Sequence, residues 1–264
     1  MTFLFFIVYL AAQKYIHMVS NPPRIEVCLS PALLHLFDTK NTIVVIIDVF
    51  RATSTIAAAL HNGATCIVPV ASVEECIQQG SEIANSLTAG ERDGKIAPGL
   101  SYGNSPLEYP AEFIKGKTLV LTTTNGTRLL HMVQDAEAII TGSFLNLSAV
   151  CDFLVLQRKN VLLGCAAWKD RFNMEDSLFA GAVVNSVKNH FTIQCDSARA
   201  CSELHKASKG NFLDFLIDSS HYRRLSGFGL QKDLAYCTTP DLHPVVPILR
   251  ENKLVIYRET FSSF

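Results

Sequence analysis

The chain has 264 residues, of which 48% are hydrophobic and 18% charged, and its formal net charge at pH 7 is -1. This composition is typical of a folded globular protein, excludes a disordered one, and at this length allows one large domain or two small ones. Because there is no net positive charge and no long run of Lys or Arg, neither nucleic acid nor a membrane surface is an expected partner.

The first seventeen residues contain an apolar run from Phe3 to Ala12. The run is shorter than the roughly 20 residues of a membrane span, and the first positive charge, Lys14, follows the run instead of preceding it as in a secretory signal. We therefore expect residues 1–17 to be an extension, disordered or due to an early start, with Met18 as the alternative first residue. A packed element and a targeting segment are the other interpretations.

From Met18 on, strand patterns alternate with helix patterns. β-branched or apolar runs predict strands at 42–49, 65–70, 117–122, 136–141 and 160–167, and apolar spacing predicts helices at 51–60, 72–87, 126–133, 147–156 and 175–187. The repeated strand, turn and helix predict an α/β fold, layered α/β/α around mostly parallel strands.

Two regions are less regular. Gly and Pro are frequent between Leu87 and Gly116, which predicts a long loop, either functional or a plain surface excursion. After Gly210 the pattern weakens before a last predicted strand at 253–257. A smaller C-terminal subdomain with a boundary near 210 is one interpretation.

The eight cysteines include no CxxC pair, and most lie inside apolar runs. This usage predicts buried, reduced thiols in the cytoplasm and no structural metal site.

Polar clusters follow three predicted strands, at the carboxyl ends where parallel sheets bind ligands. They are Asp48 to Thr53, Thr122 to Arg128, and Trp168 to Asp170. The second cluster offers hydroxyl groups, backbone N–H groups and a helix start, which together suit phosphate, although an ordinary helix cap would look the same. Arg51 could bind a phosphoryl group or a carboxylate bidentately, or pair with an acidic neighbour.

Adjacent carboxylates, Glu175 and Asp176, begin the predicted helix at 175–187. They could simply interact with the helix dipole. They could also bind Mg²⁺, which takes one or two carboxylates with water and substrate phosphate, and Asp48 and Glu91 could complete that site.

Common phosphatase motifs fit poorly. Phe50 stands where a haloacid-dehalogenase signature needs a second aspartate, and the sequence contains no Walker motif. Cys165 to Arg171 has the C-x5-R spacing of cysteine-dependent phosphatases, but the loop between them contains no glycine. This spacing leaves a cysteine-dependent mechanism as an alternative.

Six motifs occur in order: DVFRATSTI at 48–56, GERDG at 90–94, GNSPLE at 103–108, TTNGTR at 123–128, GSFLN at 142–146 and EDSLFAG at 175–181. Together they resemble the 2-phosphosulfolactate phosphatase family, and the tail from Lys232 to Pro247 is similar to its closing segment. The resemblance covers about residues 24 to 250. The chain departs from the family in its N-terminal extension and in Asp93, where glycine is expected.

The resemblance implies a cytoplasmic, Mg²⁺-dependent enzyme of coenzyme M biosynthesis that hydrolyses the phosphate ester of sulfolactate, with an α/β fold of its own formed by residues 18–264. It leaves open another small phosphorylated 2-hydroxy acid as substrate, a non-catalytic anion-binding protein, and the oligomeric state, a homo-oligomer included.

Combining the residues with the resemblance, we assign Asp48, Arg51 and Asn125 to catalysis, with Asp48 as base or nucleophile. The expected substrate contacts are Thr123, Thr124, Gly126, Arg128, Asn104 and Ser105. The expected Mg²⁺ ligands are Glu91, Glu175 and Asp176. Further positive charge in the motif loops comes from Arg92, Lys95, Lys169 and Arg171.

Overall fold

The structure, a computed structural model, describes residues 22–92, 94–123 and 126–259. The expectations for residues 1–17 and for Asp93, Thr124 and Asn125 lie outside the described residues.

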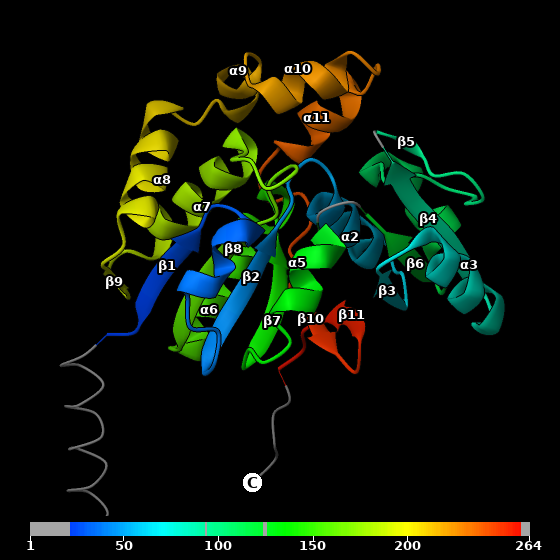
Figure 1. The fold of residues 1–264 in the computed structure, drawn as a ribbon, viewed down its shortest axis with the longest axis horizontal. Helices are drawn as coiled ribbons and strands as arrows, with labels where there is room; N and C mark the ends of the chain where they lie inside the picture. The colour runs from blue at the N-terminus through cyan, green and yellow to red at the C-terminus, as the bar shows by residue number, and fades with distance from the viewer. Residues whose placement is uncertain (1–21, 93, 124–125, 260–264) are drawn as a thin grey trace, which may run out of the picture.

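Within the described residues, eleven strands form one sheet in the order β5-β4-β6-β3-β11-β10-β7-β2-β8-β1-β9 (Figure 1). The strands are β1 (Arg24–Cys28), β2 (Thr42–Ile47), β3 (Cys66–Val70), β4 (Ser86–Arg92), β5 (Lys95–Ile96), β6 (Thr118–Thr122), β7 (Ala138–Gly142), β8 (Asn160–Cys165), β9 (Thr192–Ile193), β10 (Pro247–Arg250) and β11 (Lys253–Ile256).

The sheet consists of two parallel blocks joined by an antiparallel hairpin. One block is β9-β1-β8-β2-β7 and the other is β3-β6-β4, with the short β5 antiparallel to β4 at the edge. The hairpin β10–β11 lies between them and pairs antiparallel to each, through Ile248 with Ile140 of β7 and Leu254 with Ile67 of β3. The predicted α/β class with a mostly parallel sheet is confirmed.

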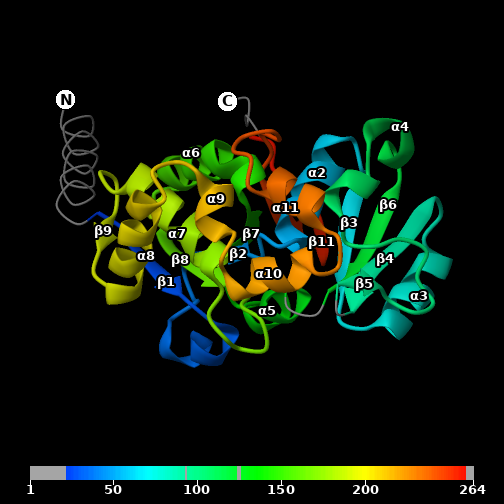
Figure 2. The ribbon, with the colours of Figure 1, turned by 90° about the horizontal axis from the view of Figure 1, so that it is seen from above.

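The helices cover both faces of the sheet and its upper edge. They are α2 (Ala52–His61), α3 (Val73–Glu82), α4 (Ala111–Ile114), α5 (Gly126–Met132), α6 (Leu147–Gln157), α7 (Met174–Val187), α8 (Asp196–Ala207), α9 (Phe212–Leu216), α10 (Ser220–Ser226) and α11 (Gln231–Cys237), with 3-10 turns at η1 (Pro31–Leu36), η2 (Pro106–Glu108) and η3 (Phe144–Asn146). Seen from above, α10 and α11 lie over the middle of the sheet (Figure 2).

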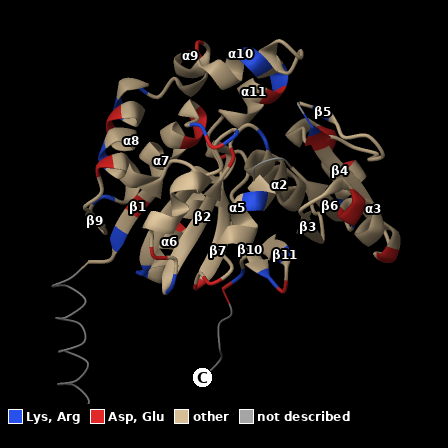
Figure 3. Ribbon diagram, viewed as in Figure 1, with Lys and Arg blue, Asp and Glu red and all other residues tan. Residues whose placement is uncertain are grey.

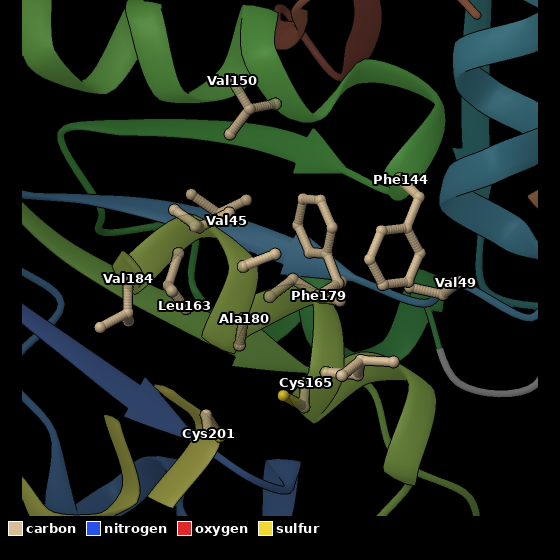
Figure 4. Close-up of a cluster of buried hydrophobic side chains, with 14 of the residues drawn as sticks. Val45, Val49, Phe144, Val150, Leu163, Cys165, Phe179, Ala180, Val184 and Cys201 are labelled. Carbon is tan, nitrogen blue, oxygen red and sulfur yellow. The ribbon is translucent and has the colours of Figure 1, made fainter. Parts of the chain in front are cut away.

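Strand β2 is apolar on both faces, as a central parallel strand requires. Its odd-numbered residues, such as Val45, pack with α6 and α7, and its even-numbered residues, such as Ile46, pack with α2 and α5. Figure 4 shows the first of these clusters, with Phe144 and Phe179 side by side. The strand is thereby held rigidly from both sides, which fixes the position of the residue that follows it.

Several local expectations are wrong. The helix predicted at 72–87 ends at Glu82, and the predicted long loop at 87–116 contains β4, β5, η2 and α4. The weak pattern after Gly210 consists of α9, α10 and α11, which have five to seven residues each and are too short to show a clear helical period. The subdomain boundary near 210 stays a prediction.

Strands β1 and β10 and helix α8 were not expected from the pattern either. None of the described helices has the length and apolar character needed to cross a membrane.

Candidate active site

A cleft lies where β2 and β8 end, below α10. It is lined by Asp48, Phe50, Arg51, Glu91, Gly94, Asn104, Trp168, Lys169, His221, Arg224 and Leu225. Four residues expected at the site, Asp48, Arg51, Glu91 and Asn104, therefore meet there from separate parts of the chain. In the view of Figure 3, acidic and basic residues are interspersed along the ribbon.

Asp48 follows directly after β2 and is 9% exposed. Burial raises the pKa of its carboxyl group to about 7, with the nearby carboxylates of Glu91 and Glu175 adding to the rise and His221 opposing it. A carboxyl group that titrates near neutral pH can both accept and release a proton under physiological conditions.

Asp176 joins the two loops that frame the cleft. One carboxylate oxygen accepts the backbone N–H of Val49 at 2.9 Å, and the other accepts that of Ala167 at 3.3 Å. Both oxygens are therefore used inside the protein, and the side chain is buried. Asp176 thereby holds the loop after β2 against the loop after β8, and its expected role as a Mg²⁺ ligand stays a prediction.

Glu175 forms a buried chain of contacts with α10. Its Oε1 lies 2.5 Å from Nδ1 of His221, and Nε2 of His221 lies 2.8 Å from Nη2 of Arg224. Because a guanidinium group can only donate, Nε2 is the acceptor and the ring proton lies on Nδ1, facing Glu175. Sequence reasoning missed His221 and Arg224, for which their i, i+3 spacing was the only signal.

Arg51 both lines the cleft and forms an ion pair. Its Nη1 lies 2.5 Å from Oδ2 of Asp233 on α11, and both side chains are nearly inaccessible to solvent. Pairing with an acidic neighbour and binding an anion are therefore compatible roles for Arg51, because the ion pair orients its guanidinium group at the cleft wall. Asn104 also lines the cleft, and its buried Oδ1 has no hydrogen-bond partner among the described residues.

The start of α5 touches Asp48. A Cβ atom at Gly126 would lie 3.0 Å from Oδ2 of Asp48, so a residue with a side chain would crowd the carboxylate. Thr123 is buried, and its Oγ1 accepts the backbone N–H of Thr127 at 3.4 Å. The start of α5 thus lies beside Asp48, although β3, β11, β10 and β7 separate β6 from β2 in the sheet.

Thr123 and Gly126 are not part of the cleft lining, and two further expected substrate contacts, Ser105 and Arg128, have partners outside it. Ser105 caps η2 by accepting the N–H of Leu107. Arg128 is half exposed and pairs with Asp170 at 2.9 Å. Neither side chain lines the cleft, and both assignments stay predictions.

The loop after β8 has an unusual backbone. Ala167, Lys169 and Asp170 have φ values of 58°, 50° and 59°. Left-handed conformations cost free energy in residues other than glycine, and such strain concentrates at functional sites. The loop places Trp168 and Lys169 on the cleft wall.

Cys165 is not suited to be a nucleophile. Its side chain is fully buried between the sheet and α7 (Figure 4), and burial raises the pKa of the thiol well above its usual value. Cysteine-dependent phosphatases need an accessible thiolate with a lowered pKa. Arg171, the other end of the C-x5-R spacing, is exposed. All eight cysteines are free thiols.

Within residues 22–92, 94–123 and 126–259, no three His, Cys, Asp or Glu side chains are arranged so that they could hold a metal ion. Mg²⁺ needs only one or two carboxylates, and Asp48 and Glu91 line the same cleft. A cation there would relieve the repulsion that contributes to the raised pKa of Asp48. Glu175 is outside the lining, with Oε1 engaged by His221. Bound Mg²⁺ remains a prediction.

A family model described as 2-phosphosulpholactate phosphatase matches residues 28–252. Relatives that carry the name "Probable 2-phosphosulfolactate phosphatase" match as well. The protein from Thermotoga petrophila is 45% identical and that from Thermotoga maritima 43%, each over 78% of this chain and 88% of the relative. The protein from Caldanaerobacter subterraneus is 39% identical over 81% of this chain and 90% of the relative.

Proposed function

Because the chain belongs to the 2-phosphosulfolactate phosphatase family, we propose that it hydrolyses 2-phospho-3-sulfolactate to sulfolactate and phosphate. The observation that carries the proposal is the position of Asp48, a buried carboxyl group with a pKa of about 7, in a cleft that also contains Arg51, Lys169 and Arg224. We assign the reaction to coenzyme M biosynthesis and, because the cysteines are free thiols, to the cytoplasm.

Arg51 is the residue best suited to bind the phosphoryl group. It lies three residues after Asp48, and its ion pair with Asp233 fixes the guanidinium group before substrate arrives. Hydrolysis of a phosphate monoester depends mainly on stabilising the charge of the transferring phosphoryl group, and a fixed donor does so without reorganising. Gly126, the first residue of α5, lies beside Asp48.

Asp48 acts in its ionised form, either as the base that takes a proton from the attacking water or as the nucleophile. When bound, Mg²⁺ would be held by Asp48 and Glu91 and would neutralise part of the phosphoryl charge. The stereochemical course at phosphorus separates the two roles of Asp48, because direct attack by water inverts the configuration once, whereas a phosphoaspartyl intermediate gives two inversions and net retention.

The test is phosphate release from 2-phosphosulfolactate, 2-phospholactate and phosphoglycolate, with Mg²⁺ and with excess chelator. We expect turnover of 2-phosphosulfolactate in Mg²⁺ and a loss of at least ~100-fold in Asp48→Asn, the scale of removing an essential group at the reacting centre. Arg223→Gln, at an exposed residue outside the lining of the cleft, serves as the control. Turnover of another phosphorylated 2-hydroxy acid in preference would reassign the substrate. Binding of sulfolactate without any phosphate release would instead identify a non-catalytic anion-binding protein.

A further inference from the structure

Two of the cations that line the cleft, Lys169 and Arg224, lie against the same aromatic ring. Nζ of Lys169 lies 4.7 Å from the centre of the Trp168 ring, and Cζ of Arg224 lies 4.5 Å from it. Neither cation forms an ion pair with any acid that the structure describes. Two like charges beside one indole ring repel each other, so this wall of the cleft favours an anion.

Arg224 also has an unused donor. Its Nε is buried without a hydrogen-bond partner among the described residues, while Nη2 donates to His221. Leaving a buried N–H group unpaired costs free energy, and the cost is recovered if an acceptor arrives with a ligand. The unpaired Nε is therefore an independent indication that a ligand binds on this side.

The orientation of Arg224 depends on Glu175. The buried carboxylate accepts the Nδ1 proton of His221, which leaves Nε2 free to accept from Arg224. With the proton on Nε2 instead, two N–H groups would face each other and Arg224 would have to move. Glu175 thus determines the tautomer of His221, and the tautomer holds the guanidinium group at the cleft wall.

We propose that Arg224, with Lys169 beside it on Trp168, binds the sulfonate group of the substrate, and that Glu175 and His221 are positioning residues for Arg224. The inference rests on the proposed function and deepens it. A sulfonate presents three oxygens and keeps its charge at all physiological pH values. Permanently charged donors such as those of Arg224 suit it well.

The first test compares Arg224→Gln with Arg223→Gln, its exposed neighbour on α10. For 2-phosphosulfolactate we expect Arg224→Gln to raise KM about 30-fold with little change in kcat, and for 2-phospholactate, which lacks the sulfonate, to change KM less than about 3-fold. Arg223→Gln should match the wild type on both substrates. An equal loss on both substrates would overturn the assignment, because Arg224 would then bind a carboxylate or the phosphoryl group.

The second test is a double-mutant cycle between Glu175→Gln and Arg224→Gln, with circular dichroism to confirm folding. If Glu175 acts only through Arg224, Glu175→Gln should raise KM about 10-fold in the wild type and have no further effect once Arg224 is changed. Independent, multiplying losses would overturn the positioning role.

A binding measurement separates this inference from the proposed function. Calorimetric titration with sulfolactate should show affinity in the wild type and about 30-fold weaker affinity in Arg224→Gln, even if no phosphate ester is turned over. Wild-type binding without turnover would refute the phosphatase activity and leave the sulfonate subsite standing. Turnover with equal sulfolactate affinity in both proteins would refute the subsite alone.

Discussion

Replacing Asp48 by Asn is expected to destroy activity and to make the protein more stable. The folded-state pKa of Asp48 is about 7, against an ordinary value of 3.8. Between pH 3.8 and about pH 7 the folded state binds a proton that the unfolded state has lost, so the free energy of unfolding falls as the pH rises. Above about pH 7 the carboxylate is ionised in both states, and the folded state bears the full free-energy cost of burying the charge. At about 1.4 kcal/mol per pKa unit, the difference of about 3 units gives a penalty on the order of 4 kcal/mol. Asn has the same shape and no charge, and therefore removes the penalty.

Thermal unfolding by circular dichroism at pH 8 and pH 5, in chelator so that no cation compensates the charge, measures the effect. At 2–4 °C per kcal/mol for a chain of roughly this size, Asp48→Asn should raise Tm by at least about 5 °C at pH 8, and by less than half of that gain at pH 5. Asp170→Asn, at an exposed carboxylate, should change Tm by less than about 1 °C. An unchanged or lower Tm for Asp48→Asn at pH 8, or a gain as large at pH 5 as at pH 8, would refute the reasoning.

Three further outcomes are expected. Glu91→Gln should lower the apparent affinity for Mg²⁺, measured from phosphate release at increasing Mg²⁺ concentration, at least about 10-fold. Full activity of the wild-type protein in chelator would contradict any role for a metal. Cys165→Ala should keep more than half of the wild-type kcat and cost about 1–2 kcal/mol in urea unfolding, because the thiol is a core side chain; an inactive but folded protein would restore the cysteine mechanism. Gly181→Ala should lower the free energy of unfolding by at least about 3 kcal/mol or prevent folding, because its Cβ would lie 1.9 Å from the carbonyl oxygen of Cys201. Gly227→Ala is the control: the nearest atom to its Cβ would be 3.3 Å away, and the loss in urea unfolding should be less than about 1 kcal/mol.

The core of the fold could be predicted because its signals are local. The β-branched run that forms β2 and the polar residue directly after it are visible in the sequence, and Asp48 and Arg51 lie where a parallel sheet binds ligands. Strand β4 was missed because SLTAGER contains few β-branched or aromatic residues, and its pairing with β6 is what makes it a strand.

The rest of the site depends on contacts between distant segments. The position of Arg224 beside Trp168 joins residues 56 apart in sequence, and no local pattern contains that pairing. Asp176 was recognised as important, but its partners are the backbone N–H groups of Val49 and Ala167, and backbone groups leave no mark in a sequence. Residue types alone therefore predicted a metal ligand at Asp176 and gave no sign of these backbone contacts.

The hairpin β10–β11 has a consequence for how the protein is made. A ribosome synthesises both parallel blocks before it reaches residues 247–256, yet these residues fill the gap between the blocks. Until they emerge, β3 and β7 each present an unpaired edge, and bare edges are where strands of different chains join and aggregate. The growing chain therefore passes through a vulnerable stage that ends only when its last described strands are inserted, and nascent chains truncated before Pro247 should be the ones that chaperones retain.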